Sequence, residues 1–312
     1  MLIAPPPEML WESVDPENEL RRRFGFEDAA AAVDWAADLL AGDYRISVRS
    51  VDRLVISAQN LMVWVTTPPS RLMIKICRIA AVHGWLDARA AMVDWLADHD
   101  HPVARPLTSL GGERQLLRDD RSIGVQPVLD GSLLDAGDDV QVRAAGQTLA
   151  ALHDDLACWP DAKRLTDAWP VAGRGELWVL PEGRAETAPE LVERLRRRID
   201  ELPDRSGLPA EQPVHTDFRG ANLLWHDTRI SGVLDFEEAR LDPAVVDLAH
   251  AVCLLGTWYH DWQPITPQRQ RLLIDSYTDR RPLSETEDRW LQALIGWGML
   301  GLGWYAEADR WL

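Results

Sequence analysis

The chain changes its pattern of apolar residues once, before its midpoint, and this change limits the folds open to it. Up to about residue 128, short β-rich stretches dominate, whereas from Asp138 onward apolar residues recur at helical spacing. Strands gathered in one part and helices in the other predict an α+β fold rather than an alternation of the two. We expect a bilobal architecture, with an antiparallel sheet in a first lobe over 1–127 and a mainly helical second lobe over 128–312.

The first lobe begins with an extension over 1–42 that we expect to be helical. Its Ala-rich part, 28–40, predicts a helix that Gly42 ends. Three strands are then predicted over 44–51, 54–67 and 71–78, with Pro68-Pro69 turning the chain between the last two. A helix and two short strands follow, over 85–98, 113–117 and 122–128.

The second lobe carries amphipathic helices. One starts near Asp138, with Asp138 or Asp139 as its N-cap, and another covers 189–202. Between them, 160–188 is punctuated by proline and glycine and predicts a long irregular connection. The last eighty or so residues are mostly helical in pattern.

Composition excludes several classes of function. The chain has 312 residues, of which 33 are basic and 50 acidic, and its net charge is −17. Such a charge repels nucleic acid and anionic membranes, and no apolar run approaches the ~18 residues that cross a bilayer. Three widely spaced cysteines, Cys77, Cys158 and Cys253, encode neither a disulfide framework nor a zinc site. With no export signal at the start, we expect a cytoplasmic protein without nucleic-acid or membrane partners.

The most informative motif is His215-x-Asp217-x-x-x-x-Asn222, the spacing of kinase catalytic loops. Asparagine occurs only three times in the chain, so an accidental match is rare. Two short apolar strands, 223–225 and 230–234, follow and predict a β-hairpin. Asn222 precedes the first strand and Asp235 follows the second, so both belong at the open end of the hairpin.

This arrangement predicts a phosphoryl-transfer site. Asn222 and Asp235 offer oxygen ligands to Mg²⁺, whose coordination nucleotide phosphates and water would complete. Asp217 would accept the proton of an attacking hydroxyl or orient it, His215 would fix the loop, and we place Arg219 in the same catalytic group. Two other interpretations stay open: an ordinary hairpin with polar ends, and a zinc site of His215 and Asp217, for which no third ligand has a familiar spacing.

A rare lysine supports the same interpretation. Lys75 and Lys163 are the only lysines, and Lys75 lies in the apolar stretch 72–77. If side chains alternate, Lys75 shares a face with Met73 and Cys77. An ammonium group there needs an anion, which nucleotide phosphates supply in kinases, although a solvated surface position would also satisfy it.

These motifs resemble those of the aminoglycoside phosphotransferase and choline kinase-like family. The strongest parts are His215–Leu224, similar to the His-Gly-Asp loop of the family, and Gly232–Glu237, similar to its Asp-aromatic-acid motif. The resemblance extends from about Tyr44 to the C-terminus. It implies a protein kinase-like fold, with a five-stranded nucleotide-binding lobe and a helical substrate lobe, and ATP-dependent phosphotransfer to a small hydroxylated molecule.

The resemblance also implies roles outside the catalytic loop. Asp247 falls where the family has a structural aspartate that braces the loop, and Gly146–His153 is a typical helix segment. Backbone groups around Gln126 and Val128 would bind the nucleotide base. Tyr277–Ser284 is similar to homoserine kinase-type members.

The sequence departs from the family pattern at three places. Position 216 is threonine, where the family commonly has glycine. The nucleotide-loop region, 53–60, has no glycine, so Ser57, Gln59 or Asn60 would replace backbone amides as phosphate ligands, and ATP versus GTP stays open. The acid that pairs with Lys75 is not obvious: we expect Asp87, although a family-like register puts Arg89 there.

The acceptor is less constrained than the chemistry. Trp258 and Asp261 lie in an aromatic cluster suited to a sugar or an ammonium group, unless the tryptophans belong to a helix end in the core. Glu237 and Glu238 follow the metal aspartate, and either could touch the acceptor or a second magnesium. We expect an aminoglycoside-like antibiotic or a related metabolite, with homoserine or an amino alcohol, or an inactive nucleotide-binding scaffold, as alternatives. The oligomeric state is not predicted.

Overall fold

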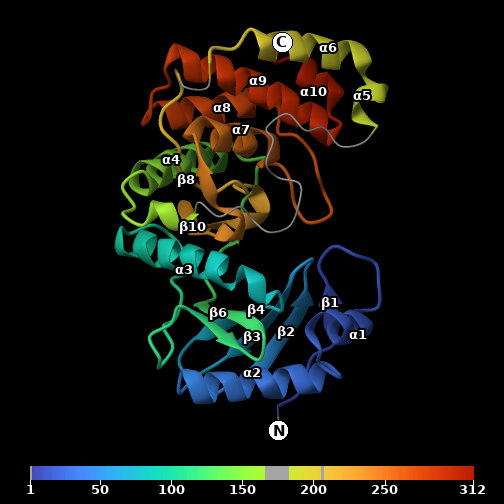
Figure 1. The fold of residues 1–312 in the computed structure, drawn as a ribbon, viewed down its shortest axis with the longest axis vertical. Helices are drawn as coiled ribbons and strands as arrows, with labels where there is room; N and C mark the ends of the chain where they lie inside the picture. The colour runs from blue at the N-terminus through green and yellow to red at the C-terminus, as the bar shows by residue number, and fades with distance from the viewer. Residues whose placement is uncertain (1, 166–182, 205–206) are drawn as a thin grey trace. The chain divides into compact units, whose positions relative to one another are not determined.

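The computed structural model describes residues 2–165, 183–204 and 207–312 and divides into two compact units. The first unit comprises the residues up to Asp98 together with Val103–Leu129, and the second comprises His99–Pro102 and Asp130–Leu312. Sheet dominates the first and helix the second, so the predicted α+β class is confirmed (Figure 1).

A six-stranded sheet forms the centre of the first unit. Its order is β1-β2-β3-β4-β6-β5, and all neighbours are antiparallel except β1 and β2. The resemblance implied five strands; the sixth, β1, comes from the N-terminal extension, which is therefore not purely helical. The strands are β1 (Pro7–Met9), β2 (Ser50–Ile56), β3 (Asn60–Thr66), β4 (Arg71–Cys77), β5 (Gln115–Arg118) and β6 (Arg121–Pro127).

Two of the predicted strands were wrong in their bounds. Of the strand predicted over 44–51, only the last two residues are in a strand, because β2 begins at Ser50. The chain then reverses at residues 57–60, where four small or polar residues interrupt the apolar run, so 54–67 is divided between β2 and β3. The turn at Pro68-Pro69 was predicted correctly, and a hydrogen bond from the Thr67 N–H to the Ser70 carbonyl closes it at 2.8 Å.

Helix α2 (Ala29–Asp43) packs on the sheet because its small apolar residues face the buried side of the strands. Ala32, Ala36 and Leu40 belong to one apolar core with residues of β2, β3 and β4. The Asp28 side chain caps the helix by accepting from the Ala31 N–H at 2.8 Å. Gly42 does not end the helix as we expected, because α2 continues through it to Asp43.

The remaining helical elements of the first unit are short or lie beside the sheet. They are α1 (Pro16–Glu19), the π-helical turn η1 (Leu20–Phe24), the 3₁₀ turn η2 (Ala80–Val82) and α3 (His83–Asp98). Helix α3 packs against β5 and β6. It agrees with the helix predicted over 85–98.

The second unit is built from helices around two small sheets. One sheet has the order β10-β9-β7 and the other pairs β11 with β8. The strands are β7 (Ser132–Leu133), β8 (Gln212–Val214), β9 (Leu223–His226), β10 (Arg229–Val233) and β11 (Arg240–Asp242). The longer helices are α4 (Asp139–Leu156), α6 (Pro189–Asp200), α7 (Ala244–Leu254), α8 (Pro267–Thr278) and α9 (Glu285–Leu302), and α10 (Tyr305–Asp309) follows.

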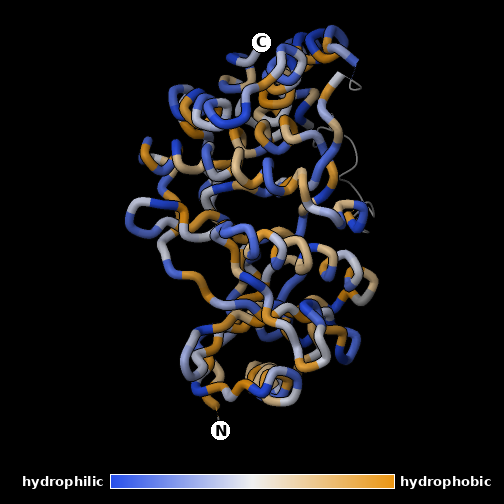
Figure 2. The backbone as a smooth tube through the Cα atoms, turned by 90° about the vertical axis from the view of Figure 1, so that its left-hand side faces the viewer, coloured by the Kyte–Doolittle hydropathy of each residue, from blue (hydrophilic) through white to orange (hydrophobic). Residues whose placement is uncertain are grey.

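Most of these helices bury one apolar face, and Figure 2 shows apolar and polar residues alternating along the chain. Helix α7 is the exception, because nearly all of its residues are buried. Asp138 caps α4 as predicted, accepting from the Val140 N–H at 2.8 Å. Of the irregular connection predicted over 160–188, the described parts are η3 (Ala162–Leu165) and α5 (Arg184–Thr187), and the rest lies outside the described residues.

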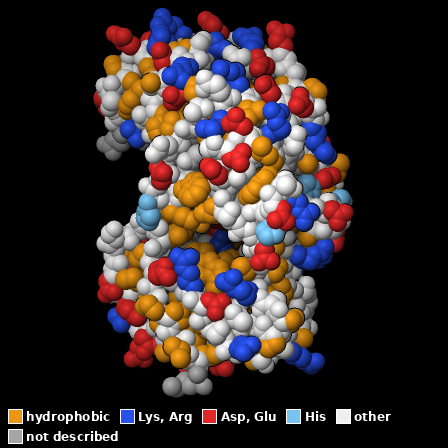
Figure 3. All heavy atoms as spheres, turned by 180° about the vertical axis from the view of Figure 1, so that it is seen from behind, with side chains coloured by type: hydrophobic (Ala, Val, Ile, Leu, Met, Phe, Trp, Pro, Cys, Tyr) orange, Lys and Arg blue, Asp and Glu red, His pale blue; other side chains and the backbone are white. Residues whose placement is uncertain are grey.

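The surface charge, the helices and the cysteines can be compared with the expectations from composition. Acidic and basic side chains are interspersed over the visible face of each unit, without a large basic patch there (Figure 3). None of the helices in the described ranges has both the length and the apolar composition of a bilayer span. Cys77, Cys158 and Cys253 form no disulfide bond.

Close packing of α4 on α8 predicts that replacing a helical glycine by alanine, which usually stabilises a helix, lowers the stability of the protein at Gly146. A Cβ on Gly146 would lie 2.5 Å from the Leu273 carbonyl oxygen and 3.0 Å from the Ser276 Cβ. Because the first atom belongs to backbone, Gly146→Ala should lower the free energy of unfolding by about 1–3 kcal/mol. Chemical denaturation followed by circular dichroism measures this change.

The matched control is Gly42→Ala in α2, where nothing lies within 4 Å of the new Cβ. Alanine favours helix over glycine, so this variant should gain about 0.5–1 kcal/mol. A stabilising effect of Gly146→Ala as well would contradict the close approach of α4 and α8.

Candidate active site

The predicted hairpin is present and brings its flanking residues together. Strands β9 and β10 pair antiparallel, with Val233 opposite Leu223. The next bond runs from the Leu234 N–H to the Asn222 carbonyl at 2.8 Å. Asn222 and Asp235 therefore lie at the same open end of the hairpin.

Asp217 lies in the loop between β8 and β9, and two neighbours hold its carboxylate. The Arg219 Nε lies 3.1 Å from Asp217 Oδ1 and 3.2 Å from Oδ2. The Asn222 amide donates to Asp217 Oδ2 at 2.7 Å and to the Asp217 carbonyl at 2.9 Å. This fixes the carboxylate while 20% of the Asp217 side chain stays exposed.

Electrostatics at Asp217 favour proton acceptance. Burial raises the pKa of Asp217, and the charge of Asp235 raises it further, while Arg219, His215 and the Asn222 hydrogen bond lower it in part. The net shift is upward, so the carboxylate is a stronger base than an ordinary aspartate.

His215 holds the loop in place from its interior. The ring is fully buried; its Nδ1 accepts from the Asp217 N–H at 3.2 Å, so its Nε2 is the atom that donates to the Leu234 carbonyl, at 2.9 Å. Phe236 packs on the ring with centroids 4.5 Å apart. His215 thus joins the catalytic loop to the strand that leads to Asp235.

Asp247, on α7, braces the same loop from below. Its buried carboxylate accepts from the backbone N–H groups of His215 and Thr216 at 2.8 and 2.7 Å and contacts His153 Nε2 at 2.9 Å. Burial by itself raises the pKa of Asp247, but the hydrogen bond and charge of His153, followed by His215, outweigh it and lower that pKa to about 2. The carboxylate is therefore ionised at neutral pH.

Thr216 adopts a backbone conformation that a β-branched residue rarely takes. Its φ is +68°, in the left-handed region, where glycine carries no Cβ penalty. The Thr216 hydroxyl compensates by donating to the Glu238 carbonyl at 2.9 Å. The departure from the family glycine is therefore a strained turn held by a hydrogen bond.

An aromatic loop after α7 touches the catalytic loop. A Cβ on Gly220 would meet the Trp258 Nε1 at 2.9 Å, and the Arg219 guanidinium lies 5.9 Å from the Trp262 ring centroid. The Trp258 N–H donates to the Asp261 carbonyl at 2.7 Å, which closes this loop. Trp258 is 38% and Trp262 46% exposed, so these tryptophans do not belong to the core.

The donor set suits a magnesium ion. Since the Asn222 nitrogen faces Asp217, its amide oxygen is the atom left for a cation, and Asp235 adds an exposed carboxylate. No cluster of three or more His, Cys, Asp or Glu suited to a metal occurs in the described part of the chain. Two hard oxygen donors fit an ion whose other ligands are phosphates and water. Glu237 and Glu238, half-buried, follow in the 3₁₀ turn η6 (Phe236–Glu238).

In the first unit, Lys75 lies in the middle of β4. Leu72, Ile74 and Ile76 are buried on one face as predicted, and Lys75 is half-buried on the other. Asp87 is half-buried on α3. Arg89, which stands where the family-like register puts an acid, is buried with its guanidinium carbon 3.1 Å from the Trp85 ring centroid and donates to the Trp85 carbonyl at 3.1 Å.

The structure gives partners to groups that we expected to contact the nucleotide. The Val128 N–H donates to the Arg71 carbonyl at 3.0 Å, within the sheet. Met73 lies opposite Gln126 two residues along the same pair of strands, so the Gln126 backbone also faces β4. The Ser57 hydroxyl contacts the Asn60 backbone inside the turn. The roles of these residues in nucleotide binding stay predictions.

Comparison with known proteins decides the family. The model of the phosphotransferase enzyme family matches residues 52–286, well over half of the chain. The chain belongs to this family. The match includes the whole hairpin and its flanking residues, and the resemblance seen in the sequence is confirmed.

Relatives and solved structures agree with this assignment. The homoserine kinase of Phenylobacterium zucineum (strain HLK1) is 28% identical over 206 residues, which cover 65% of this chain and 62% of that enzyme. The chain thus spans less than two thirds of the length of this curated relative. Amicoumacin kinase hAmiN, solved with AMP-PNP, Ca²⁺ and Ami, has a TM-score of 0.64 at 16% identity, covering 94% of both chains. A microcompartment-associated aminopropanol kinase has a TM-score of 0.61 at 20% identity, covering 88% of this chain and 89% of that one. These likenesses show the protein kinase-like fold.

Sequence reasoning missed two residues that support the loop. His153 lies in the helix segment noted as typical of the family, yet its bond to Asp247 was not anticipated. Its other ring nitrogen contacts the Tyr277 hydroxyl at 2.8 Å, and both side chains are buried. A histidine on the apolar stripe of α4 was the available signal, because a buried imidazole needs polar partners.

The strained turn predicts that glycine at position 216 gives a more stable protein than alanine. Thr216→Ala loses the bond to Glu238 and keeps the strained φ, so it should be about 1–2 kcal/mol less stable than wild type. Thr216→Gly loses the same bond but relieves the strain, and should be about 1 kcal/mol more stable than Thr216→Ala. Urea unfolding of the three proteins measures this order, and an alanine variant as stable as the glycine variant would contradict it.

The low pKa of Asp247 predicts a loss of stability in acid. Because the folded-state pKa of about 2 lies below the ordinary value of 3.8, the ionised carboxylate stabilises the fold above the ordinary value. Its contribution, about 2 kcal/mol, is lost as the pH falls through the folded-state pKa. Asp247→Asn should be less stable at neutral pH, and its deficit against wild type should shrink between pH 4 and pH 2.

Unfolding free energies measured against pH for both proteins check this, with Asp227→Asn as the control. The Asp227 side chain is 82% exposed, so its variant should follow the wild-type curve. A deficit of Asp247→Asn that did not change with pH would show that the carboxylate charge plays no part.

Proposed function

We propose that the chain is a small-molecule kinase that transfers the γ-phosphate of ATP to a hydroxyl group. The observation that supports this best is the grouping of Asp217, Asn222 and Asp235 at the open end of one hairpin, with Asp217 held by Arg219 and Asn222. Phosphoryl transfer needs positioning and charge neutralisation more than covalent chemistry, and this group can provide both.

Each side chain has a defined part in this proposal. Asp217 accepts the hydrogen bond of the acceptor hydroxyl and takes its proton as the oxygen attacks phosphorus. Arg219 holds that carboxylate in one orientation, and His215 keeps the loop in register with β10. Asn222 and Asp235 would hold magnesium, which when bound neutralises charge on the nucleotide phosphates. Within the first unit, Lys75 is the residue that would pair with nucleotide phosphates.

For the acceptor we propose a small amino alcohol of the homoserine class. The curated relatives named homoserine kinase support this choice over an aminoglycoside-like antibiotic. The chemistry of the aromatic loop is compatible, because the exposed faces of Trp258 and Trp262 can attract an ammonium group. Asp261 and Glu237 could add carboxylates nearby.

The inactive-scaffold alternative has less support. A scaffold does not require the Asp217 carboxylate to be held in one orientation from two sides, by Arg219 and Asn222. We place the reaction in the cytoplasm, where ATP and Mg²⁺ are available.

The test is an assay of ADP or GDP release with Mg-ATP or Mg-GTP and a panel of acceptors. The panel holds homoserine, aminopropanol and an aminoglycoside, and we expect the amino alcohols to stimulate release most. Asp217→Asn should lower kcat by about 100-fold or more, because the proton acceptor is lost, while binding of Mg-nucleotide in calorimetry largely survives.

If only the aminoglycoside stimulated release, the proposed acceptor would be wrong, but phosphotransfer to a hydroxyl group would be supported. Equal turnover by Asp217→Asn would contradict the catalytic assignment. Binding of Mg-ATP without transfer to any acceptor would favour the scaffold.

A further inference from the structure

The turn between β2 and β3, residues 57–60, is built without the backbone freedom that such turns usually use. It has no glycine, and none of its four residues, all of which are described, has a positive φ. The Ser57 N–H donates to the Asn60 carbonyl at 2.8 Å, but the Asn60 N–H donates to the Ser57 hydroxyl at 3.1 Å rather than to the Ser57 carbonyl. Inside the turn, the Ser57 hydroxyl thus serves as the hydrogen-bond acceptor in place of the Ser57 backbone carbonyl.

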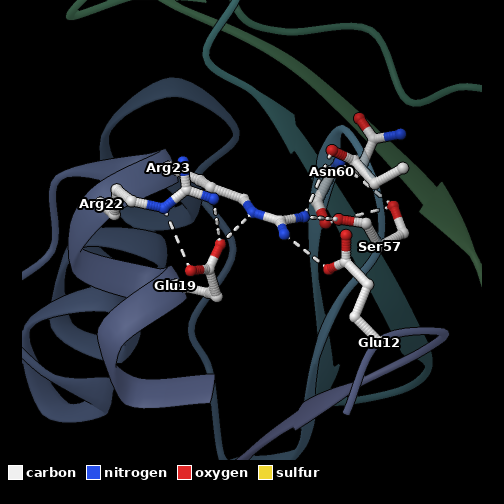
Figure 4. Close-up of polar contacts among 7 residues, drawn as sticks. Glu12, Glu19, Arg22, Arg23, Ser57 and Asn60 are labelled. Carbon is white, nitrogen blue, oxygen red and sulfur yellow. Dashed lines mark hydrogen bonds and ion pairs between the residues drawn. The ribbon is translucent and has the colours of Figure 1, made fainter. Parts of the chain in front are cut away.

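That carbonyl turns instead toward Arg23, which lies far from it in sequence. The Arg23 Nη1 donates to the Ser57 carbonyl at 3.2 Å and to the Ala58 carbonyl at 3.5 Å. Glu12 holds the other Nη at 2.5 Å, and Glu19 accepts from Nε (Figure 4). Since two carboxylates balance its charge, Arg23 is engaged on all sides and is suited to fixing the turn rather than to binding phosphate itself.

The N-terminal extension has the rigidity that this contact needs. Leu20 and Phe24 of η1 are buried in the core, so the backbone on both sides of Arg23 is anchored. Strand β1 pairs with β2 as far as Met9 opposite Ile56, and the Leu10 N–H donates to the Ile56 carbonyl at 2.8 Å. The extension therefore follows β2 to the residue before the turn.

Peptide geometry links these contacts to ligand binding. In a planar trans peptide the N–H points opposite to the C=O. With the Ser57 and Ala58 carbonyls held toward Arg23, the following N–H groups, of Ala58 and Gln59, point to the opposite side of the turn. Two successive N–H groups aimed the same way form a site for an anion.

We propose that Arg23 is a positioning residue that orients the Ala58 and Gln59 amides toward the phosphates of the nucleotide. This inference rests on the proposed function, because it assumes that the β2–β3 turn faces a nucleotide. In a glycine-rich turn, the backbone freedom of glycine allows the amides to point toward a phosphate. In this chain, an arginine outside the turn would orient them.

The experiment compares Arg23→Ala with Arg22→Ala, because Arg22 also pairs with Glu19 but, among the residues that the structure describes, forms no hydrogen bond or ion pair with the turn. Calorimetry measures the Kd of Mg-AMP-PNP and of adenosine for each protein. Arg23→Ala should weaken Mg-AMP-PNP about tenfold, the size of one or two lost charge-assisted hydrogen bonds, and leave adenosine unchanged. KM for ATP should rise by a similar factor with kcat within about twofold, and Arg22→Ala should match wild type.

A second variant covers the case in which Arg23→Ala does not fold. Ser57→Ala keeps Arg23 but removes the hydroxyl that accepts from the Asn60 N–H, so the Ser57 carbonyl should return to the turn and Mg-AMP-PNP should again bind more weakly than in wild type. Unchanged Mg-AMP-PNP binding by a folded Arg23→Ala, or an equal loss of adenosine, would overturn the positioning role alone. A wild-type protein that binds no Mg-nucleotide would overturn the proposed function as well.

Discussion

The buried carboxylate of Asp247 is the contact on which the candidate active site depends. It joins α7 to the backbone of His215 and Thr216 and to His153 on α4. A buried charge is costly unless its hydrogen bonds are satisfied, and here backbone donors and an imidazole meet that requirement. The same bonds hold the loop in one conformation, including the left-handed φ of Thr216. The packing of α7 and α4 and the conformation of the loop therefore depend on each other.

The loop held by Asp247 leads directly into the hairpin that carries the other candidate site residues. The loop enters β9, the hairpin returns through β10, and the open end of the hairpin brings Asn222 and Asp235 to one place. His215 links the start of the loop to Leu234 at the end of that hairpin. Since Asp217 lies between these two connections, its carboxylate has little freedom to move, as the proposed role in orienting and deprotonating a hydroxyl requires.

The first unit uses a different means to order a loop. Families with glycine-rich loops exploit backbone freedom, whereas here Ser57 and Arg23 replace it with hydrogen bonds. The N-terminal extension therefore helps to fix the β2–β3 turn, through the contacts of Arg23 with the Ser57 and Ala58 carbonyls. It also adds β1, a sixth strand that the family resemblance did not imply.

The sequence by itself determined the α+β class, the order of most helices and strands, the hairpin, and the grouping of Asn222 with Asp235. These are properties of local pattern and spacing, since period, turn residues and the antiparallel return of a hairpin need no distant partner. Only the tertiary structure decided the contacts of His153, Tyr277 and Arg23, the division of 54–67 into two strands, and the use of the Val128 N–H within the sheet. Each depends on residues far apart in the chain, and a single sequence does not specify which distant polar groups will meet once the apolar faces are buried.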